Sequence, residues 1–344
     1  VLDRLPVGAV IAAGDGSIEY RNPSASALSG THVGVLIDEL VTKHLAEAVS
    51  GGHSGETIDL FGPPQRVVVV HAESLPNGGA VAFVEDITDQ RRADQARTDF
   101  VANVSHELRT PIGALIALAD SLVGTEEVEV TERVVGRMQL EADRASRIVE
   151  DLLELSEIEA GVERDRRVVS LPDVVHDAIG RVAELAGRAG IEIVYPGACR
   201  GEDGAVELAV NGDRSRLVSA VGNVVENAVK YSEPGGVVHV GVRAADGWGE
   251  VVVSDEGVGI PRRDLDRVFE RFYRVDRARS RSTGGTGLGL SIVRHIAHAH
   301  DGSVAVESIE GQGTTFVLRL PLQTEVEMAR AESAGSPPEP EGTV

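Results

Sequence analysis

The stretch Phe100-Val-Ala-Asn-Val-Ser-His106-Glu107-Leu-Arg-Thr110-Pro111-Ile112 decides how the rest of the chain is organised. Apolar side chains in and after it recur at alternating steps of three and four residues, with Pro111 filling the position between Leu108 and Leu115: Val101, Val104, Leu108, Leu115, Leu118 and Leu122. Such spacing is typical of a coiled-coil seam. Since His106 falls between these steps, the pattern predicts a histidine on the outer flank of a helix.

The neighbours of His106 suggest chemistry. Thr110 lies four residues on, so its hydroxyl is expected one turn away on the same helix face. Pro111 lacks an amide hydrogen and cannot bond the Glu107 carbonyl, which predicts a bend. A lone helical histidine is usually a solvated or core residue, and that interpretation is kept for the others: His32, His44, His53, His71, His176, His239, His295, His298 and His300. At His106, an adjacent acid and a nearby hydroxyl indicate an accessible nucleophile.

Composition narrows the class of protein. The 344 residues suffice for two or three domains, and with 3% aromatic residues the cores must be aliphatic. A net charge of −22 argues against direct binding to nucleic acid or an anionic membrane. The single cysteine, Cys199, excludes internal disulfides and indicates a reducing, cytoplasmic setting. Because the chain begins with Val1 at a folded-looking segment and contains no membrane-spanning run, a membrane anchor upstream of it is a further expectation.

Residues 1–88 are expected to form a small α/β module. A helix is predicted at Val33–Ser50, and strands at Val7–Ala13, Ser17–Tyr20, Arg66–Ala72 and Ala80–Glu85. This order of elements, with Asn22-Pro23-Ser24 and Glu85-Asp86-Ile87-Thr88, resembles a PAS sensor domain. Its ligand is open: the module has no cysteine for a flavin adduct, and haem binding through His32, His44, His53 or His71 competes with ordinary surface histidines.

Residues 89–165 predict a helical hairpin. A charged linker helix continues into the His106 helix, Gly124-Thr125 interrupts it, and a second helix is expected at 128–160. This second helix has its own seam: Val134, Met138, Ala145, Ile148, Leu152 and Leu155. Pairing two hairpins in a four-helix bundle would bury both seams, so a homodimer is predicted. A coiled-coil spacer without chemistry is the alternative.

Residues 166–323 show a mixed α/β pattern, and 324–344 a disordered acidic tail. Helices are expected at 171–188, 213–231 and 288–300. Strands are expected at 191–195, 206–210, 237–243, 249–254, 303–308 and 314–320.

A polar helix face carries the first nucleotide-binding cluster. Asn223, Asn227 and Lys230 share this face by their spacing. Carboxamide oxygens suit Mg²⁺, Lys230 supplies a positive charge for phosphates, and Tyr231 offers a ring beside a base. The alternative is a polar face that merely covers a core.

The second cluster follows a strand. Asp255 is the last residue of this strand. At the end of a strand, a carboxylate can accept a hydrogen bond from an exocyclic amine such as adenine N6. Gly257 and Gly259, followed by Ile260, let the backbone approach a ligand closely. By itself, such a glycine turn is common.

A glycine-rich loop forms the third cluster. Its backbone amides precede a helix and predict an anion site; the residues concerned are Gly285, Thr286, Gly287, Leu288 and Gly289. The spacing matches neither a dinucleotide-binding fingerprint nor a P-loop. Arg274, upstream of it, could reach a terminal phosphate or pair with Asp276, and Val275–Thr283 is expected to be a basic lid.

Together the box around His106 and these clusters resemble sensor histidine kinases of two-component systems. The three clusters match the N, G1 and G2 boxes, and the stretch Phe269-Glu-Arg-Phe-Tyr-Arg274 between the last two matches the F box. The turn Gly311-Gln-Gly-Thr-Thr-Phe316 matches the glycine turn that follows these boxes in the family. The resemblance covers residues 90–322. It implies a multidomain α+β protein: a PAS-like sensor, a dimeric four-helix bundle and an α/β sandwich of the GHKL ATPase type. The layout and the stretch 277–285 look most like actinobacterial phosphate-responsive (PhoR-like) kinases.

The resemblance also implies a reaction. Mg·ATP would phosphorylate His106, and the phosphoryl group would pass to an aspartate of a response regulator. Glu107 could accept the proton or orient the imidazole, and Thr110 would orient water for phosphatase activity. Asn223 and Asn227 would hold Mg²⁺, Asp255 would bind adenine, and Gly287 and Gly289 would flank the phosphates. A gyrase- or Hsp90-type ATPase without kinase activity, and a dimeric scaffold or phosphatase, are the alternatives.

Overall fold

A computed structural model describes residues 2–27, 32–61, 65–76, 78–123, 127–160, 166–197, 208–275 and 285–323. The chain divides into two compact units, Val1–Ala102 and Asn103–Val344. The acidic tail predicted at 324–344, the Gly124-Thr125 turn and residues 276–283 of the predicted lid lie outside the described residues.

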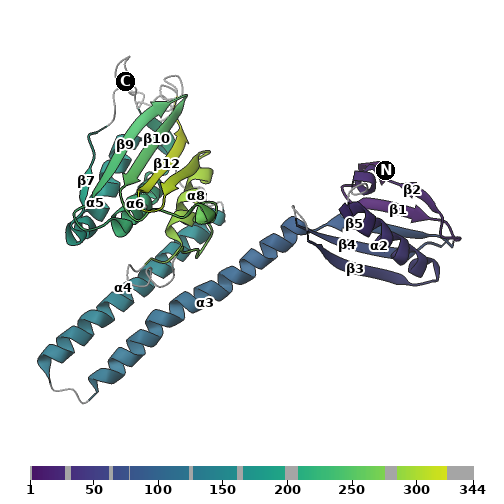
Figure 1. The fold of residues 1–344 in the computed structure, drawn as a ribbon, viewed down its shortest axis with the longest axis horizontal. Helices are drawn as coiled ribbons and strands as arrows, with labels where there is room; N and C mark the ends of the chain where they lie inside the picture. The colour runs from purple at the N-terminus through teal and green to yellow at the C-terminus, as the bar shows by residue number, and fades with distance from the viewer. Residues whose placement is uncertain are drawn as a thin grey trace, which may run out of the picture. The chain divides into compact units, whose positions relative to one another are not determined.

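A five-stranded antiparallel sheet with strand order β2-β1-β5-β4-β3 forms the first unit. After a short 3-10 helix, Leu2–Arg4, its elements are β1 Gly8–Ala12, β2 Ile18–Arg21, α1 Pro23–Ala27, α2 His32–Val49, β3 His53–Leu60, β4 Arg66–Ser74 and β5 Ala80–Asp86 (Figure 1). Helix α2 packs against the sheet over an aliphatic core. The predicted strands and helix are present.

Strand β3 and the short α1 are absent from the sequence-based prediction. β3 is an edge strand whose residues are mostly exposed, so its sequence, His-Ser-Gly-Glu-Thr-Ile-Asp-Leu, lacks a regular apolar alternation. The expectation that the histidines of this module lie at the surface is wrong for His44. This side chain is buried, and its Nδ1 lies 2.7 Å from Ser54 Oγ.

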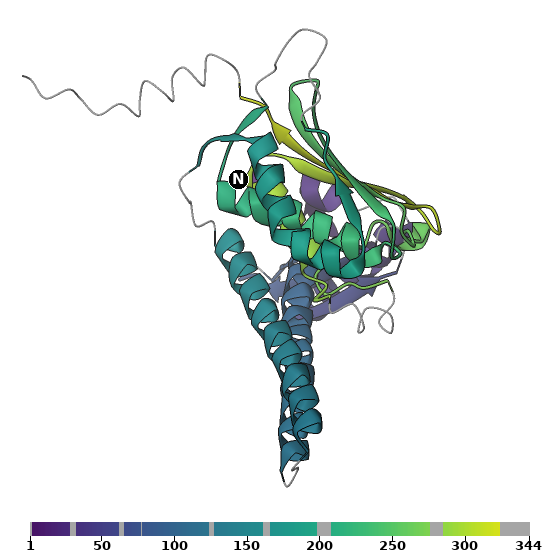
Figure 2. The same cartoon turned by 90° about the vertical axis from the view of Figure 1, so that its left-hand side faces the viewer.

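Two long helices, α3 Thr88–Leu122 and α4 Val128–Glu159, form the predicted antiparallel hairpin (Figures 1 and 2). α3 is one helix from the linker to its end, and it passes through Pro111 without interruption. On α4, Ile148 and Leu155 of the predicted seam are buried. Large apolar side chains remain exposed on both helices, among them Ile112, Ile116, Val135, Val149 and Leu153.

The rest of the second unit is a sheet covered on one face by helices (Figure 2). The five-stranded sheet has the order β11-β12-β10-β9-β7, and β6 pairs with β8. The elements are β6 Arg167–Ser170, α5 Leu171–Ala189, β7 Glu192–Val194, β8 Ala209–Gly212, α6 Arg214–Tyr231, β9 Val237–Ala245, β10 Trp248–Asp255, a 3-10 helix Arg262–Asp264, α8 Gly289–Ala299, β11 Ser303–Ile309 and β12 Gly313–Pro321. All three predicted helices are present. β8 corresponds to the strand predicted at 206–210, whose residues 206 and 207 lie outside the described residues, and β6 is an additional strand.

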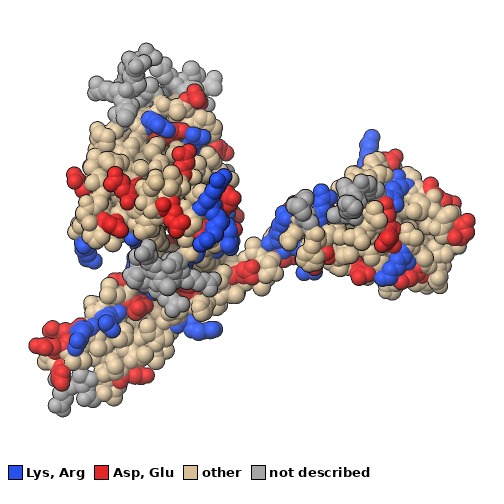
Figure 3. Space-filling view, viewed as in Figure 1, with Lys and Arg blue, Asp and Glu red and all other residues tan. Residues whose placement is uncertain are grey.

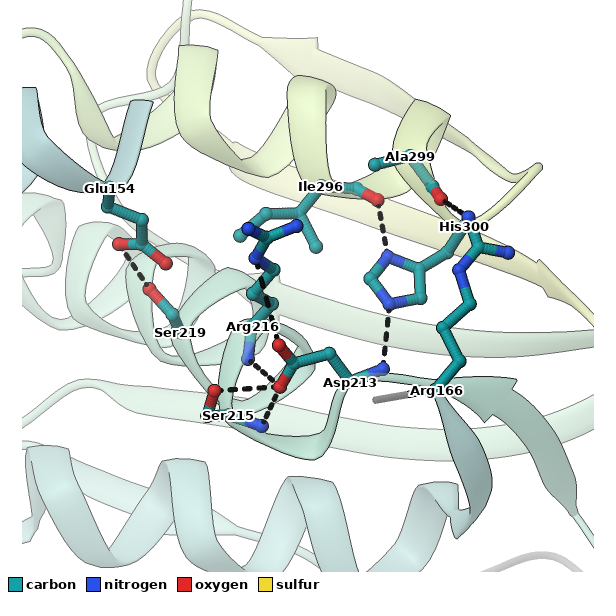
Figure 4. A network of polar contacts seen from close by, with 9 residues as sticks. All are labelled: Glu154, Arg166, Asp213, Ser215, Arg216, Ser219, Ile296, Ala299 and His300. Atoms are coloured by element: carbon teal, nitrogen blue, oxygen red, sulfur yellow. Dashed lines mark hydrogen bonds and ion pairs between the residues drawn. The ribbon is translucent and has the colours of Figure 1, made fainter. Parts of the chain in front are cut away.

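A buried polar network joins the start of α6 to the end of α8 (Figure 4). Asp213 caps α6, since its Oδ1 accepts hydrogen bonds from the backbone N–H groups of Ser215 and Arg216 at 2.8 and 3.2 Å. The Asp213 N–H donates to His300 Nε2 at 3.0 Å, and His300 Nδ1–H donates to the Ile296 carbonyl at 2.8 Å. The ring must therefore be neutral to make both bonds.

Acid should weaken this network. Burial lowers the pKa of His300 below its usual value near 6.5, so the unfolded chain binds this proton more readily than the folded one. The free energy of unfolding should therefore fall as the pH drops from about 6.5 through the folded pKa. Urea unfolding of wild type at pH 7.5 and 5.5 measures this loss. It should shrink in His300→Gln but persist in His298→Gln, which changes an exposed histidine; an equal loss in all three proteins would contradict the assignment.

Acidic and basic side chains are interspersed on the visible face of each unit (Figure 3). The negative net charge is therefore not gathered into one patch on that face. None of the helices in the described part of the chain combines the length and hydropathy that a membrane span requires.

Candidate functional site

A cavity of about 440 Å³ opens among α6, the end of β10 and the start of α8. Twelve of the predicted nucleotide-binding residues line it: Asn223, Asn227, Lys230, Tyr231, Asp255, Gly259, Ile260, Arg274, Gly285, Thr286, Gly287 and Gly289. Gly257 and Leu288 do not. Leu288 is fully buried, because it is the apolar residue that anchors the start of α8 in the core.

Helix α6 places the first cluster. Asn223, Asn227 and Lys230 all line the cavity, as their spacing predicts. Lys230 Nζ is 2.5 Å from Glu226 Oε1, one turn earlier on the helix. Glu226 therefore forms an ion pair with Lys230 at the cavity. The sequence analysis did not name Glu226, although the four-residue spacing between the acid and the lysine predicts such a pair on a helix.

Strand β10 delivers Asp255 to the cavity at its carboxyl end. Burial raises the pKa of this carboxyl group, while hydrogen bonds from the backbone of Gly257 and Thr314 oppose the rise. The Gly257 N–H donates to Asp255 Oδ1 at 2.8 Å. Because each oxygen of a carboxylate can accept more than one hydrogen bond, Asp255 can also accept one from a ligand.

Gly257 has a packing role beside the cavity. A Cβ at this position would lie 2.3 Å from the Tyr231 carbonyl oxygen and 2.8 Å from Asp255 Oδ1. Gly257→Ala must therefore displace backbone at the site, and we expect nucleotide to bind about 10- to 100-fold more weakly, in keeping with the roughly 1–3 kcal/mol cost of overpacking. Titration with a fluorescent ATP analogue measures the change. The control is Gly241→Ala in β9, because a Cβ at this position would have no atom within 4 Å apart from its chain neighbours. Equal nucleotide affinity in the two variants would contradict the prediction.

The glycine loop is tied to the elements around it. Gly287 adopts a φ of 75°, and its carbonyl accepts a hydrogen bond from the Phe272 N–H at 2.8 Å. Thr286 Oγ1 accepts from the Leu288 N–H at 3.2 Å. At Gly289 a Cβ would lie 2.9 Å from Asn223 Oδ1, so the absence of a side chain lets α8 begin against the amide of α6.

The segment before the loop presents Arg274. This side chain is 9% exposed, and its Nη1 lies 3.6 Å from Glu107 Oε2 on α3. Asp276, the alternative partner considered from sequence, lies outside the described residues. Tyr273, which also lines the cavity, donates from its hydroxyl to Asp264 at 2.6 Å and stacks under Arg267.

His106 is exposed on α3, as predicted. Thr110 is exposed one turn later, where its hydroxyl donates to the His106 carbonyl at 3.2 Å. Glu107 is 22% exposed and lies beside two arginines, Arg274 and Arg144. The imidazole is thus open to solvent, while its acidic neighbour is partly enclosed.

Helix α4 adds residues that the sequence did not single out. Asp151 lines the cavity and accepts a hydrogen bond from Thr286 Oγ1 at 2.8 Å, and burial raises its pKa to about 6. Glu154 accepts from Ser219 at 2.9 Å, and Glu159 pairs with Arg271. These acids are far from their partners in sequence, so no spacing could reveal the contacts.

Comparison with known proteins identifies the family. The family described as His Kinase A (phospho-acceptor) domain matches residues 96–161, and the histidine kinase-, DNA gyrase B- and HSP90-like ATPase family matches residues 212–324. The sensor-like histidine kinase SenX3 of Mycobacterium tuberculosis is 36% identical over 98% of this chain and 83% of its own length. This chain belongs to the sensor histidine kinases.

Two further relatives agree. The sensor histidine kinase WalK of Bacillus subtilis is 36% identical over 75% of this chain and 42% of its own length. The histidine kinase ThkA, in a crystal structure with the response regulator TrrA, shares the fold of this chain with a TM-score of 0.52 and 19% identity. The match covers 92% of this chain and 96% of the ThkA chain. The chain is therefore an autophosphorylating protein-histidine kinase that acts on a response regulator. A phospho-acceptor domain argues against a kinase-inactive ATPase.

Proposed function

We propose that His106 is the phosphoacceptor and that the cavity between α6 and α8 binds the ATP that phosphorylates it. The observation that supports this most is the gathering of twelve predicted nucleotide-binding residues around one cavity. Asp255 would accept the adenine amine, and the amides of the loop before α8 would bind phosphate oxygens.

Divalent metal fits the same cavity. Asn223 and Asn227 line it with carboxamides and Glu226 with a carboxylate, which are oxygen donors that Mg²⁺ accepts together with phosphates and water. Within the described residues, no three histidine, cysteine or carboxylate side chains form a metal site of their own. We therefore assign Mg²⁺ to the ATP complex, where it would neutralise phosphate charge.

The hairpin residues would carry out the chemistry. A ring nitrogen of His106 attacks the γ-phosphorus, a P–N bond forms, and the bond to the β-phosphate oxygen breaks to release ADP. Glu107 accepts the proton of the other ring nitrogen or orients the ring. In the phosphatase reaction, Thr110 would orient the water that hydrolyses the phosphorylated regulator. Its hydroxyl group, one helical turn from His106, supports this role.

We further propose that two chains pair through their hairpins. The exposed valines, leucines and isoleucines of α3 and α4 would be buried by a second hairpin. The first unit would act as a PAS-like sensor on the linker part of α3, and its five-stranded antiparallel sheet with α2 supports that interpretation. A PhoR-like response to phosphate and a membrane anchor upstream of residue 1 complete the proposal.

Incubation with γ-labelled ATP and Mg²⁺ tests the central claim. We expect a protein-bound phosphate that acid removes and base does not, as for a phosphohistidine, and its transfer to a receiver-domain aspartate. A base-labile, acid-stable label would contradict phosphorylation of a histidine. A label that forms equally well after Asn227→Ala would contradict the assigned ATP site.

A further inference from the structure

Arg144 of α4 faces the acidic neighbour of the phosphoacceptor. Its Nη2 lies 3.8 Å from Glu107 Oε2, across the hairpin from α4 to α3. The two side chains are 13% and 22% exposed. A charge pair this well shielded from water is screened less than a surface pair, so it restrains both partners more strongly.

Arg144 is largely shielded from water, so its guanidinium group depends on the contact with Glu107. Its Nε is buried and has no hydrogen-bond partner among the described residues. Glu107 therefore supplies the negative charge that compensates the guanidinium group. Since leaving one partner of a buried pair alone is unfavourable, the arginine and the carboxylate hold one another in place.

A second arginine competes for the same oxygen. Arg274 Nη1 lies 3.6 Å from Glu107 Oε2. Arg274 also lines the cavity proposed to bind ATP, where its guanidinium group would turn to the phosphates. Arg144 belongs to the hairpin itself, so it is the cation that stays with Glu107 when Arg274 engages the nucleotide.

We propose that Arg144 is a positioning residue for the phosphorylation of His106, acting through Glu107. It fixes the carboxylate so that it can receive the proton that the ring loses as the P–N bond forms and ADP departs. This inference rests on the proposed roles of His106 and Glu107. Nothing in the sequence distinguishes Arg144 from the other arginines of α4, because only the pairing of the two helices brings it to Glu107.

Autophosphorylation kinetics of the full chain test the proposal. We expect Arg144→Gln to lower kcat about 10- to 100-fold, as displacement of a catalytic group does, with little change in the KM for ATP. Arg144→Lys should recover most of the loss. Arg137→Gln removes the same charge from an exposed site on α4 and should match wild type. Thermal unfolding followed by circular dichroism checks that each variant retains its helices.

A double-mutant cycle separates positioning from a general structural role. If Arg144 acts through Glu107, the double variant of Glu107→Gln and Arg144→Gln should be no slower than Glu107→Gln alone. Multiplied losses, or a rate for Arg144→Gln equal to that for Arg137→Gln, would overturn the proposal while leaving His106 as phosphoacceptor. A wild-type chain without a phosphohistidine would instead overturn the proposed function and this inference with it.

Discussion

Replacement of His106 by glutamine should abolish labelling by γ-labelled ATP, to at least about a hundredfold below wild type, because no other group would supply the nucleophile. The side chain is exposed, so its substitution removes no core contact. Folding and nucleotide binding should remain intact, since other residues line the cavity that we propose binds ATP. The measurement is the initial rate of label incorporation, with binding of a fluorescent ATP analogue recorded on the same preparation.

The control for this variant is His298→Gln, which changes an exposed histidine on α8. It should be labelled at the wild-type rate. An acid-labile label that survives in His106→Gln would show that another histidine is the acceptor. Loss of ATP-analogue binding in His106→Gln would show that the variant had failed for a structural reason instead.

Replacement of Asp255 by asparagine should raise the KM for ATP about 10- to 100-fold. The Gly257 N–H already occupies Oδ1, so the substituted amide keeps its one oxygen for the backbone and offers an NH₂ group to the base. Two donors would then face one another, which removes a charged hydrogen bond worth roughly 1.5–3 kcal/mol. The kcat at saturating ATP should change much less.

The neighbouring acid provides a matched control, since Glu256 is exposed beside the site. Glu256→Gln should leave the KM for ATP at its wild-type value. A purine without the exocyclic amine, offered as its triphosphate, should lose little further affinity in Asp255→Asn. An unchanged KM in that variant would contradict the contact between Asp255 and adenine.

Local pattern predicted much of this protein. Four of the five strands of the first unit, both hairpin helices and the three helices of the ATP-binding part follow from apolar periodicity, glycine turns and helix starts. The edge strand β3 was not predicted, because few of its residues are buried and its sequence therefore lacks an apolar alternation. The Leu288 side chain is buried in the core and does not line the cavity. The sequence did not predict this, because a glycine-rich motif does not show which of its residues anchors the following helix.

The sequence by itself determined which groups are available for chemistry: a histidine with an adjacent acid, carboxamides at one-turn spacing, and glycines before a helix. These are short-range relationships, which helix geometry and backbone freedom fix directly. Only the tertiary structure decided that Arg144 and Arg274 share Glu107, and that Asp151 meets Thr286. Those pairs join residues 37 to 167 positions apart, so their contact depends on packing that no local pattern encodes.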